Sequence, residues 1–198
     1  MPHTRERSIA TRPPPTAPVA LGTCLRTPGR HLWHPVVVTV DTPAVRAAEA
    51  AGIPHRVVVT EIARNPEESA ALQAIDLRAL IRSIVVRRGE DDYVFVLVPG
   101  GRRFDWARLR AHLGVSRLSL PDKDEAQAVT GYERGAITPF GSVRALPVIA
   151  DVSMMGLESV AIGGGRRGVN LHLAPADLVA ATGATVADVT VPGEPAES

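Results

Sequence analysis

Residues 130–141 read Thr-Gly-Tyr-Glu-Arg-Gly-Ala-Ile-Thr-Pro-Phe-Gly, and residues 163–168 read Gly-Gly-Gly-Arg-Arg-Gly. Glycine has no Cβ atom, so loops this rich in glycine let the backbone approach a ligand closely and turn its amide groups toward it. The arginines beside the glycines carry the charge that binds a phosphate. The two loops together predict a site for an anionic or nucleotide-like substrate.

Short helices and strands are expected on both sides of these loops. Capping residues followed by proline or an acidic first turn predict helices at 42–52, from Asn65 toward Leu80, and at 105–114, 122–129 and 175–183. Runs of β-branched and aromatic residues predict strands at 35–40, 55–60, 83–88, 93–98, 117–120, 146–150, 159–162 and 169–173. The strand at 55–60 is expected to be buried, and turn residues 89–92 join the next two strands in a hairpin.

Hairpins mixed with short helices predict a single α/β domain: a mixed, mainly antiparallel sheet with helices packed on it. A Rossmann fold is not expected, because the glycines at 163–165 lie between two strands and no helix follows to receive a pyrophosphate. The domain is expected at residues 34–192. A disordered arm with prolines and arginines is expected at 1–30, and a flexible tail at 193–198.

The composition limits the classes of function. With 198 residues and 45% hydrophobic content the chain can form one full core, and its net charge of +1 leaves any basic surface local. With so low a net charge, DNA is not an expected partner. A membrane is not expected either, since no apolar run reaches the roughly 18 residues of a membrane span. A single cysteine, Cys24, excludes an internal disulfide. These features, with no secretory signal at the N-terminus, predict a cytoplasmic protein.

Several polar and aromatic residues are open to two interpretations. Asn170 and His172 share the polar face of the strand that leaves the second glycine loop; Asn170 either lines the site or is a surface residue. Asp151 either orients the glycine loops or has a structural role. Tyr132 and Phe140 either stack on a base or pack against the domain. The histidines and the cysteine lack the spacing of metal ligands, so we expect no metal and no cofactor.

Five segments in the same order resemble the YbaK and prolyl-tRNA-synthetase-associated editing-domain family of free-standing aminoacyl-tRNA deacylases. They cover Thr42–Pro54, Tyr93–Pro99, Thr130–Tyr132, Gly135–Gly141 and Gly164–Gly168, and the resemblance extends over about residues 36–190. It implies hydrolysis of the ester that joins a wrong amino acid to the terminal adenosine of a tRNA, without a metal. The implied partner is a mischarged aminoacyl-tRNA, with an aminoacyl-tRNA synthetase as a second candidate. A non-catalytic module that binds tRNA or a nucleotide-like ligand is the alternative.

An aminoacyl ester is already activated, so positioning and amide donors facing the developing oxyanion can supply most of the catalysis. By this resemblance and the loop chemistry, the expected catalytic residues are Arg82, Gly135 and Gly164. The expected substrate-binding residues are Thr138, Pro139, Phe140, Gly163, Gly165, Asn170 and Asp151.

Three of these positions depart from the family pattern. Arg82 stands where the family usually has lysine, Gly163 where many members have serine or alanine, and Asn170 where an aspartate is frequent. Arginine keeps the positive charge but cannot transfer a proton at neutral pH. The sequence therefore predicts that Arg82 positions the substrate rather than acting as an acid or base.

Overall fold

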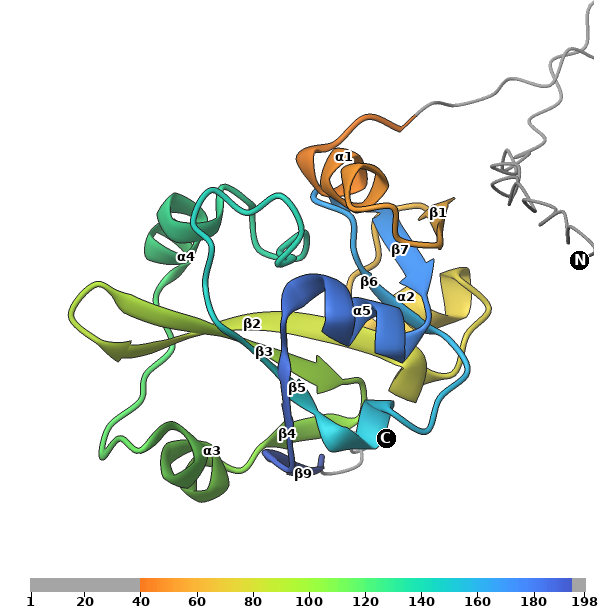
Figure 1. Ribbon diagram of the computed structural model, residues 1–198. Coiled ribbons are helices and arrows are strands. Elements are labelled where there is room, and N and C mark those ends of the chain that lie inside the picture. Colours follow the sequence, from red (N-terminus) through yellow and green to blue (C-terminus); the bar gives the residue numbers. More distant parts are fainter. Residues whose placement is uncertain (1–39, 194–198) are drawn as a thin grey trace, which may run out of the picture. The chain divides into compact units, whose positions relative to one another are not determined.

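A seven-stranded mixed sheet forms the centre of the domain in the computed structural model, which describes residues 40–193 (Figure 1). Its strand order is β1-β7-β6-β2-β3-β5-β8, and a separate pair is formed by β4 and β9. The strands are β1 (His55–Val59), β2 (Leu80–Gly89), β3 (Asp92–Pro99), β4 (Arg102–Phe104), β5 (Val148–Asp151), β6 (Val160–Gly163), β7 (Val169–Leu173), β8 (Thr185–Ala187) and β9 (Thr190–Pro192).

The longer strand pairings are antiparallel. They join β2 to β3 as the predicted hairpin, β1 to β7 and β7 to β6. The parallel pairings of β2 with β6, β3 with β5 and β5 with β8 involve fewer residues. The predicted mixed, mainly antiparallel sheet is therefore confirmed.

Helices pack on both faces of this sheet. They are α1 (Pro43–Ala50), α2 (Pro66–Leu72), α3 (Trp106–Leu113), α4 (Lys123–Thr130) and α5 (Pro175–Thr182), with 3-10 turns η1 (Leu77–Ala79) and η2 (Val152–Met154). The predicted capping residues are found at the starts of α1 to α4: Thr42, Asn65, Asp105 and Asp122 each accept hydrogen bonds from backbone amides of the first turn. These side chains satisfy amides that the helix itself leaves free.

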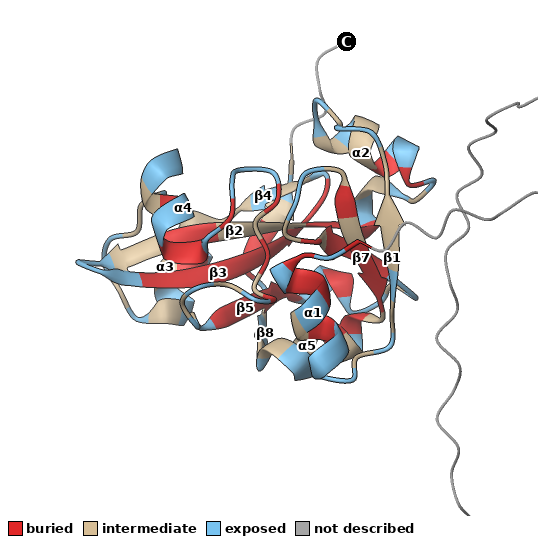
Figure 2. Cartoon of the chain, turned by 90° about the horizontal axis from the view of Figure 1, so that it is seen from above, coloured by how far each residue is buried: buried red, intermediate tan, exposed pale blue. Residues whose placement is uncertain are grey.

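The central strands β3 and β5 are largely buried (Figure 2), and strand alternation separates two apolar layers. On one face, Phe95, Leu97 and Ile162 pack with residues of α1, α5 and the loop after α4. On the other face, α3 covers Val86 and Val94 and their neighbours, while α2 covers a smaller cluster that contains Leu80 and Ala161. A strip of sheet between these last two clusters carries Arg82 and Asn170.

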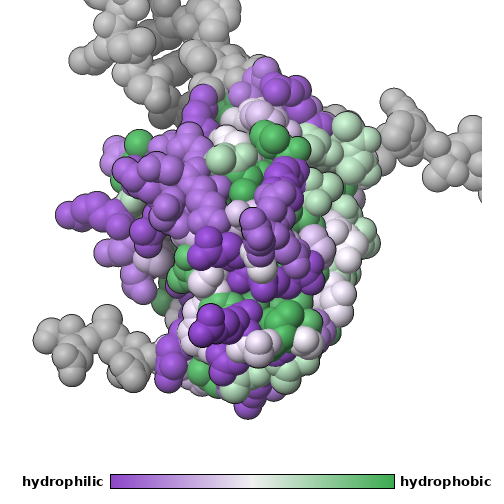
Figure 3. All heavy atoms as spheres, turned by 90° about the vertical axis from the view of Figure 1, so that its left-hand side faces the viewer, coloured by the Kyte–Doolittle hydropathy of each residue, from purple (hydrophilic) through white to green (hydrophobic). Residues whose placement is uncertain are grey.

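The end of the domain that carries the β2–β3 hairpin and α4 is largely hydrophilic (Figure 3). Two of its arginines are neutralised by nearby carboxylates. Arg87 Nη1 lies 3.1 Å from Glu125 Oε1 and Arg88 Nη2 lies 2.7 Å from Asp92 Oδ1. Arg87 and Arg88, with Arg117, also line a surface crevice at this end of β2.

Some sequence-based assignments are wrong. β1 is a half-buried edge strand rather than a buried one, because β7 is its one neighbour among the strands of residues 40–193. Residues 117–120 form a single bridge, Ser119 with Arg87, and no strand. α2 ends at Leu72 and the chain turns at Ala74, whose φ is 53°. The apolar spacing beyond it comes from Ile75 and Leu77, which pack under a turn and not on a continued helix.

Three short strands, β4, β8 and β9, were not predicted, because three-residue segments carry almost no periodicity. Some predictions lie outside the described residues. They are the arm at 1–30 with Cys24, the strand at 35–40 except for Val40, and the tail at residues 194–198. Within residues 40–193 no helix has the length and apolar character needed to cross a membrane.

Candidate active site

The two glycine loops are in contact. A Cβ atom added to Gly163 would lie 2.9 Å from the carbonyl oxygen of Ile137, and one added to Gly165 would lie 2.9 Å from Tyr132 Cε1. In Figure 1 the first loop lies between α4 and α1, above β2. Thr42 Oγ1 also donates a 2.6 Å hydrogen bond to the carbonyl oxygen of Gly164 and so ties the second loop to the start of α1. The loops, far apart in sequence, therefore make one surface.

Strand register brings Arg82 to this surface. Ile81 of β2 pairs with Ile162 of β6, so Arg82 and Gly163 follow side by side. Gly163 in turn pairs with Asn170 of β7. Neighbouring residues in one row of a sheet point to the same face. Arg82 and Asn170 therefore project from the same face of the sheet on either side of Gly163, against which the first loop rests.

The guanidinium of Arg82 has unused hydrogen-bonding capacity. Its Nη2 donates to the carbonyl oxygen of Arg102, but its Nε is buried and has no partner among the described residues. No carboxylate of residues 40–193 lies within ion-pair distance of it. Burial lowers the pKa of Arg82, and the charge of Glu67 opposes this, yet an arginine stays protonated at neutral pH. A half-buried cation without a carboxylate partner suits a carbonyl or phosphate oxygen.

The first loop, which rests against Gly163 beside Arg82 in the sheet, offers free backbone amides. The amides of Gly135 and Ile137 donate to no described residue, whereas Ala136 N donates to Glu133 O at 3.0 Å. Gly135 has a φ of +91° and is exposed, and an added Cβ would have open space apart from Arg167, whose Nε lies 3.6 Å away. The glycine is thus required by its backbone conformation, and its amide is available to an oxyanion.

Gly164 does not fit its predicted catalytic role. Its amide donates a 2.9 Å hydrogen bond to Val169 O, so it has no N–H left for an oxyanion. An added Cβ would lie 2.6 Å from Val169 Cγ1. The protein itself, and not a ligand, occupies the space beside this glycine. Gly165 likewise faces Tyr132 and Ala44.

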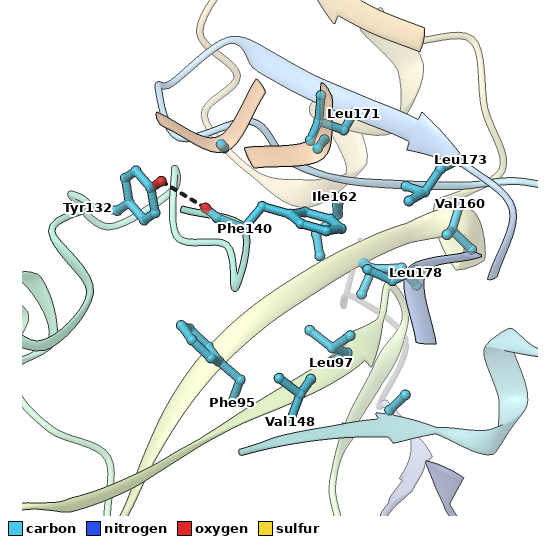
Figure 4. Close-up of a cluster of buried hydrophobic side chains, with 14 of the residues drawn as sticks. Phe95, Leu97, Tyr132, Phe140, Val148, Val160, Ile162, Leu171, Leu173 and Leu178 are labelled. Atoms are coloured by element: carbon cyan, nitrogen blue, oxygen red, sulfur yellow. Dashed lines mark hydrogen bonds between the residues drawn. The ribbon is translucent and has the colours of Figure 1, made fainter. Parts of the chain in front are cut away.

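Two predicted substrate-binding residues, Thr138 and Phe140, are buried away from the site. Phe140 is 6% exposed and points into the core beside Ile162 (Figure 4), where Tyr132 Oη donates to its carbonyl oxygen at 2.8 Å. Packing, rather than base stacking, is therefore the role of both rings. Thr138 is fully buried, and its Oγ1 accepts from Phe140 N. These side chains fold the loop instead of contacting a ligand.

Asp151 has the structural role that the sequence left open. It is fully buried at the end of β5, where it accepts hydrogen bonds from Ser153 N and Val189 N and lies 3.7 Å from Arg102 Nε. Burial raises the pKa of Asp151, but hydrogen bonds, chiefly from Ser153, outweigh this effect and hold the pKa below its usual value. It caps η2 and does not orient the glycine loops.

His172 is a satisfied core residue. Its Nε2 lies 2.8 Å from Gln73 Oε1 and its Nδ1 lies 3.3 Å from Arg56 Nη2. Arginine can only donate, so Nδ1 accepts and the neutral ring carries its proton on Nε2. Burial, with the nearby charge of Arg56, lowers the pKa of His172 to about 4. Both ring nitrogens are engaged, which leaves no general base here.

Comparison with known proteins identifies the family. The family model for the aminoacyl-tRNA editing domain matches residues 60–181, a stretch that holds Arg82, both glycine loops and Asn170. The chain belongs to the aminoacyl-tRNA editing domain family. The resemblance inferred from the sequence is thereby confirmed.

Relatives of this editing domain occur as single proteins and as parts of larger ones. The "Putative Cys-tRNA(Pro)/Cys-tRNA(Cys) deacylase EbsC" of Enterococcus faecalis is 22% identical over 75% of this chain and 93% of its own length. A "Proline--tRNA ligase" of Thermosipho africanus is 28% identical over 54% of this chain, which spans only 19% of that ligase. The crystal structure of "a putative trans-editing enzyme for prolyl tRNA synthetase" has a TM-score of 0.71 at 27% identity and covers 77% of this chain and 99% of its own.

Arg167 is a site-bordering residue that sequence reasoning did not single out. Its side chain reaches from the second loop to Gly135 of the first. In the sequence, Arg166 and Arg167 inside a glycine-rich turn predict phosphate binding. They do not indicate which of the two side chains reaches the other loop.

Proposed function

We propose that this chain is a trans-editing aminoacyl-tRNA deacylase that hydrolyses the ester between a mischarged amino acid and the terminal adenosine of a tRNA. The observation that supports it most directly is the half-buried cation of Arg82, which has no carboxylate partner among the described residues and lies next in the sheet to Gly163, where the first glycine loop rests. A substrate of this kind is met in the cytoplasm, and an aminoacyl-tRNA synthetase is the partner that would produce it.

In the proposed reaction, water attacks the ester carbonyl carbon, and the bond from that carbon to the ribose oxygen breaks. Negative charge develops on the carbonyl oxygen, where the amides of Gly135 and Ile137 and the Arg82 guanidinium can stabilise it. The water loses a proton, and the leaving ribose oxygen gains one to become a hydroxyl. Arg82 cannot carry it and His172 is engaged, so the proton passes through solvent or a substrate hydroxyl.

A panel of aminoacylated tRNAs, each incubated with a catalytic amount of the protein, tests the proposal. We expect release of free amino acid, with many turnovers, from at least one mischarged tRNA. The matched control is Arg103→Ala, which removes an exposed arginine of β4 and should leave the rate unchanged. A protein that binds tRNA but releases no amino acid from any member of the panel is instead the non-catalytic module.

A further inference from the structure

The glycine loops carry three exposed arginines without a carboxylate partner among the described residues: Arg134, Arg166 and Arg167. Arginines elsewhere on the surface are often neutralised, as Arg64 is by Glu68 at 3.0 Å. The two loops contain a single acidic residue, Glu133. They therefore form a local excess of positive charge on a chain whose net charge is only +1.

The second loop holds its arginines on a firmly anchored turn. Val169 N donates to Arg166 O at 3.0 Å, and Thr60 N donates to Gly168 O at 2.8 Å. Four successive amides, from Gly165 to Gly168, donate to no described residue. Successive free amides around residues of positive φ make an anion-binding concavity, and Gly165 and Gly168 have φ values of +80° and +76°. Fixed amides and guanidinium groups together suit a phosphate.

The side chain of Arg167 links this turn to the first loop. Its Nε is 3.6 Å from the position that a Cβ of Gly135 would take, and Arg134 precedes Gly135 in the chain. Arg167 and Arg134 therefore border the free amide assigned above to the oxyanion, and Arg166 stands beside Arg167 in the second loop. Arg82, in contrast, is half-buried. The half-buried Arg82 therefore suits the ester, and the solvent-exposed arginines suit the charged phosphates of the RNA backbone.

We propose that Arg134, Arg166 and Arg167, the arginine rim, bind phosphates of the single-stranded 3′ end of the RNA whose terminal ester enters beside Arg82. The assignment rests on the proposed function, because the ester and its RNA reach the site together. The rim binds and positions the substrate and takes no part in bond making. Guanidinium groups bind phosphate oxygens in bidentate fashion, and the bound RNA releases counterions, so the contribution is salt-dependent.

The test measures binding of an uncharged RNA oligonucleotide with a 3′-terminal CCA over a range of salt concentrations. We expect the Arg166→Ala/Arg167→Ala double variant to lower the slope of log K against log salt by about 1.4, at about 0.7 per phosphate contact of a single strand. Binding at low salt should weaken by about 10-fold or more. The control is Arg103→Ala/Arg117→Ala, which removes the same charge from exposed, unpaired positions outside the loops and should change neither quantity. Arg134→Ala should reproduce half of the change in slope.

Equal slopes of log K against log salt for the two double variants would overturn the proposal that the rim binds RNA phosphates. This holds even if the protein hydrolyses aminoacyl-tRNA. Inorganic phosphate that competes as well as the oligonucleotide at equal concentration would also overturn the assignment to RNA. The two proposals can fail separately. If the wild-type protein hydrolyses no aminoacyl-tRNA but the rim variant loses oligonucleotide binding, the deacylase activity is refuted and phosphate binding by the rim is supported. Deacylation gives the matching kinetic result: the rim variant should raise KM for aminoacyl-tRNA and leave kcat nearly unchanged.

Discussion

Arg82 combines a full positive charge, partial burial and one N–H without a partner. Its row neighbour Gly163 has no side chain, and a Cβ there would meet the backbone of the first loop at 2.9 Å. The loop can thus lie closer to the sheet than serine or alanine at this position would allow. The departures at residues 82 and 163 are therefore neighbours in the sheet.

Replacement of Arg82 should therefore affect the reaction more than the fold. We expect Arg82→Ala to reduce kcat/KM for deacylation by about 10- to 1000-fold, the scale of losing one or two charge-assisted contacts. Arg82→Lys should keep much of the activity, because the charge is retained. Initial rates with one mischarged tRNA measure this, and a wild-type rate in the alanine variant would remove Arg82 from the site.

Gly135 can be tested against a glycine of similar conformation. Gly114 ends α3 with a φ of +67° and is exposed, as Gly135 is with a φ of +91°. Alanine at either position should cost about 1 kcal/mol of unfolding free energy through backbone strain. Only Gly135→Ala should lose deacylation beyond its loss of folded protein. If both variants lose activity only in proportion to the folded fraction, the first loop is scaffolding.

Helix α1 and the second glycine loop form one unit at the scale of elements. Thr42 Oγ1 accepts a 3.1 Å hydrogen bond from Val45 N and donates to Gly164 O, so one hydroxyl caps the helix and anchors the loop. Thr42 is only 3% exposed. A capping signal in the sequence therefore marks a tertiary contact as well as a helix start.

Thr42→Ala should be more destabilising than the loss of an ordinary cap. Asn65, the cap of α2, is exposed and makes only the local bond to Glu68 N. Asn65→Ala should cost about 1 kcal/mol. Thr42→Ala should cost about 2–4 kcal/mol, because it also leaves the carbonyl of Gly164 unpaired, and Thr42→Ser should restore most of it. Urea unfolding compares the three variants, and equal costs at the two caps would show that the contact to the loop is unimportant.

At the scale of the whole molecule, a buried polar link joins the edge of the sheet to a helix. His172 of β7 joins Arg56 of β1 to Gln73 at the end of α2 while buried and neutral. The unfolded chain regains the ordinary pKa of about 6.5. The folded protein holds the pKa near 4, so between these values the unfolded state binds the extra proton.

Stability should therefore fall as the pH drops from about 6.5 to about 4, and this term should be constant above and below that window. The full loss is about 3 kcal/mol. His172→Gln should flatten this part of the pH profile, measured as the free energy of urea unfolding. His112→Gln, on the exposed surface of α3, should not. An unchanged slope in the His172 variant would show that another group titrates.

Across the whole molecule, the sequence alone determined the features that depend on near neighbours. Four capped helix starts, the β2–β3 hairpin and the two glycine loops follow from residues a few positions apart, and five ordered segments identified the family. Only the tertiary structure decided which side chains reach the site. The order β7-β6-β2 sets Asn170, Gly163 and Arg82 in one row, and packing turns Phe140 into the core. Strand pairing and burial depend on contacts between distant segments, which local pattern does not encode.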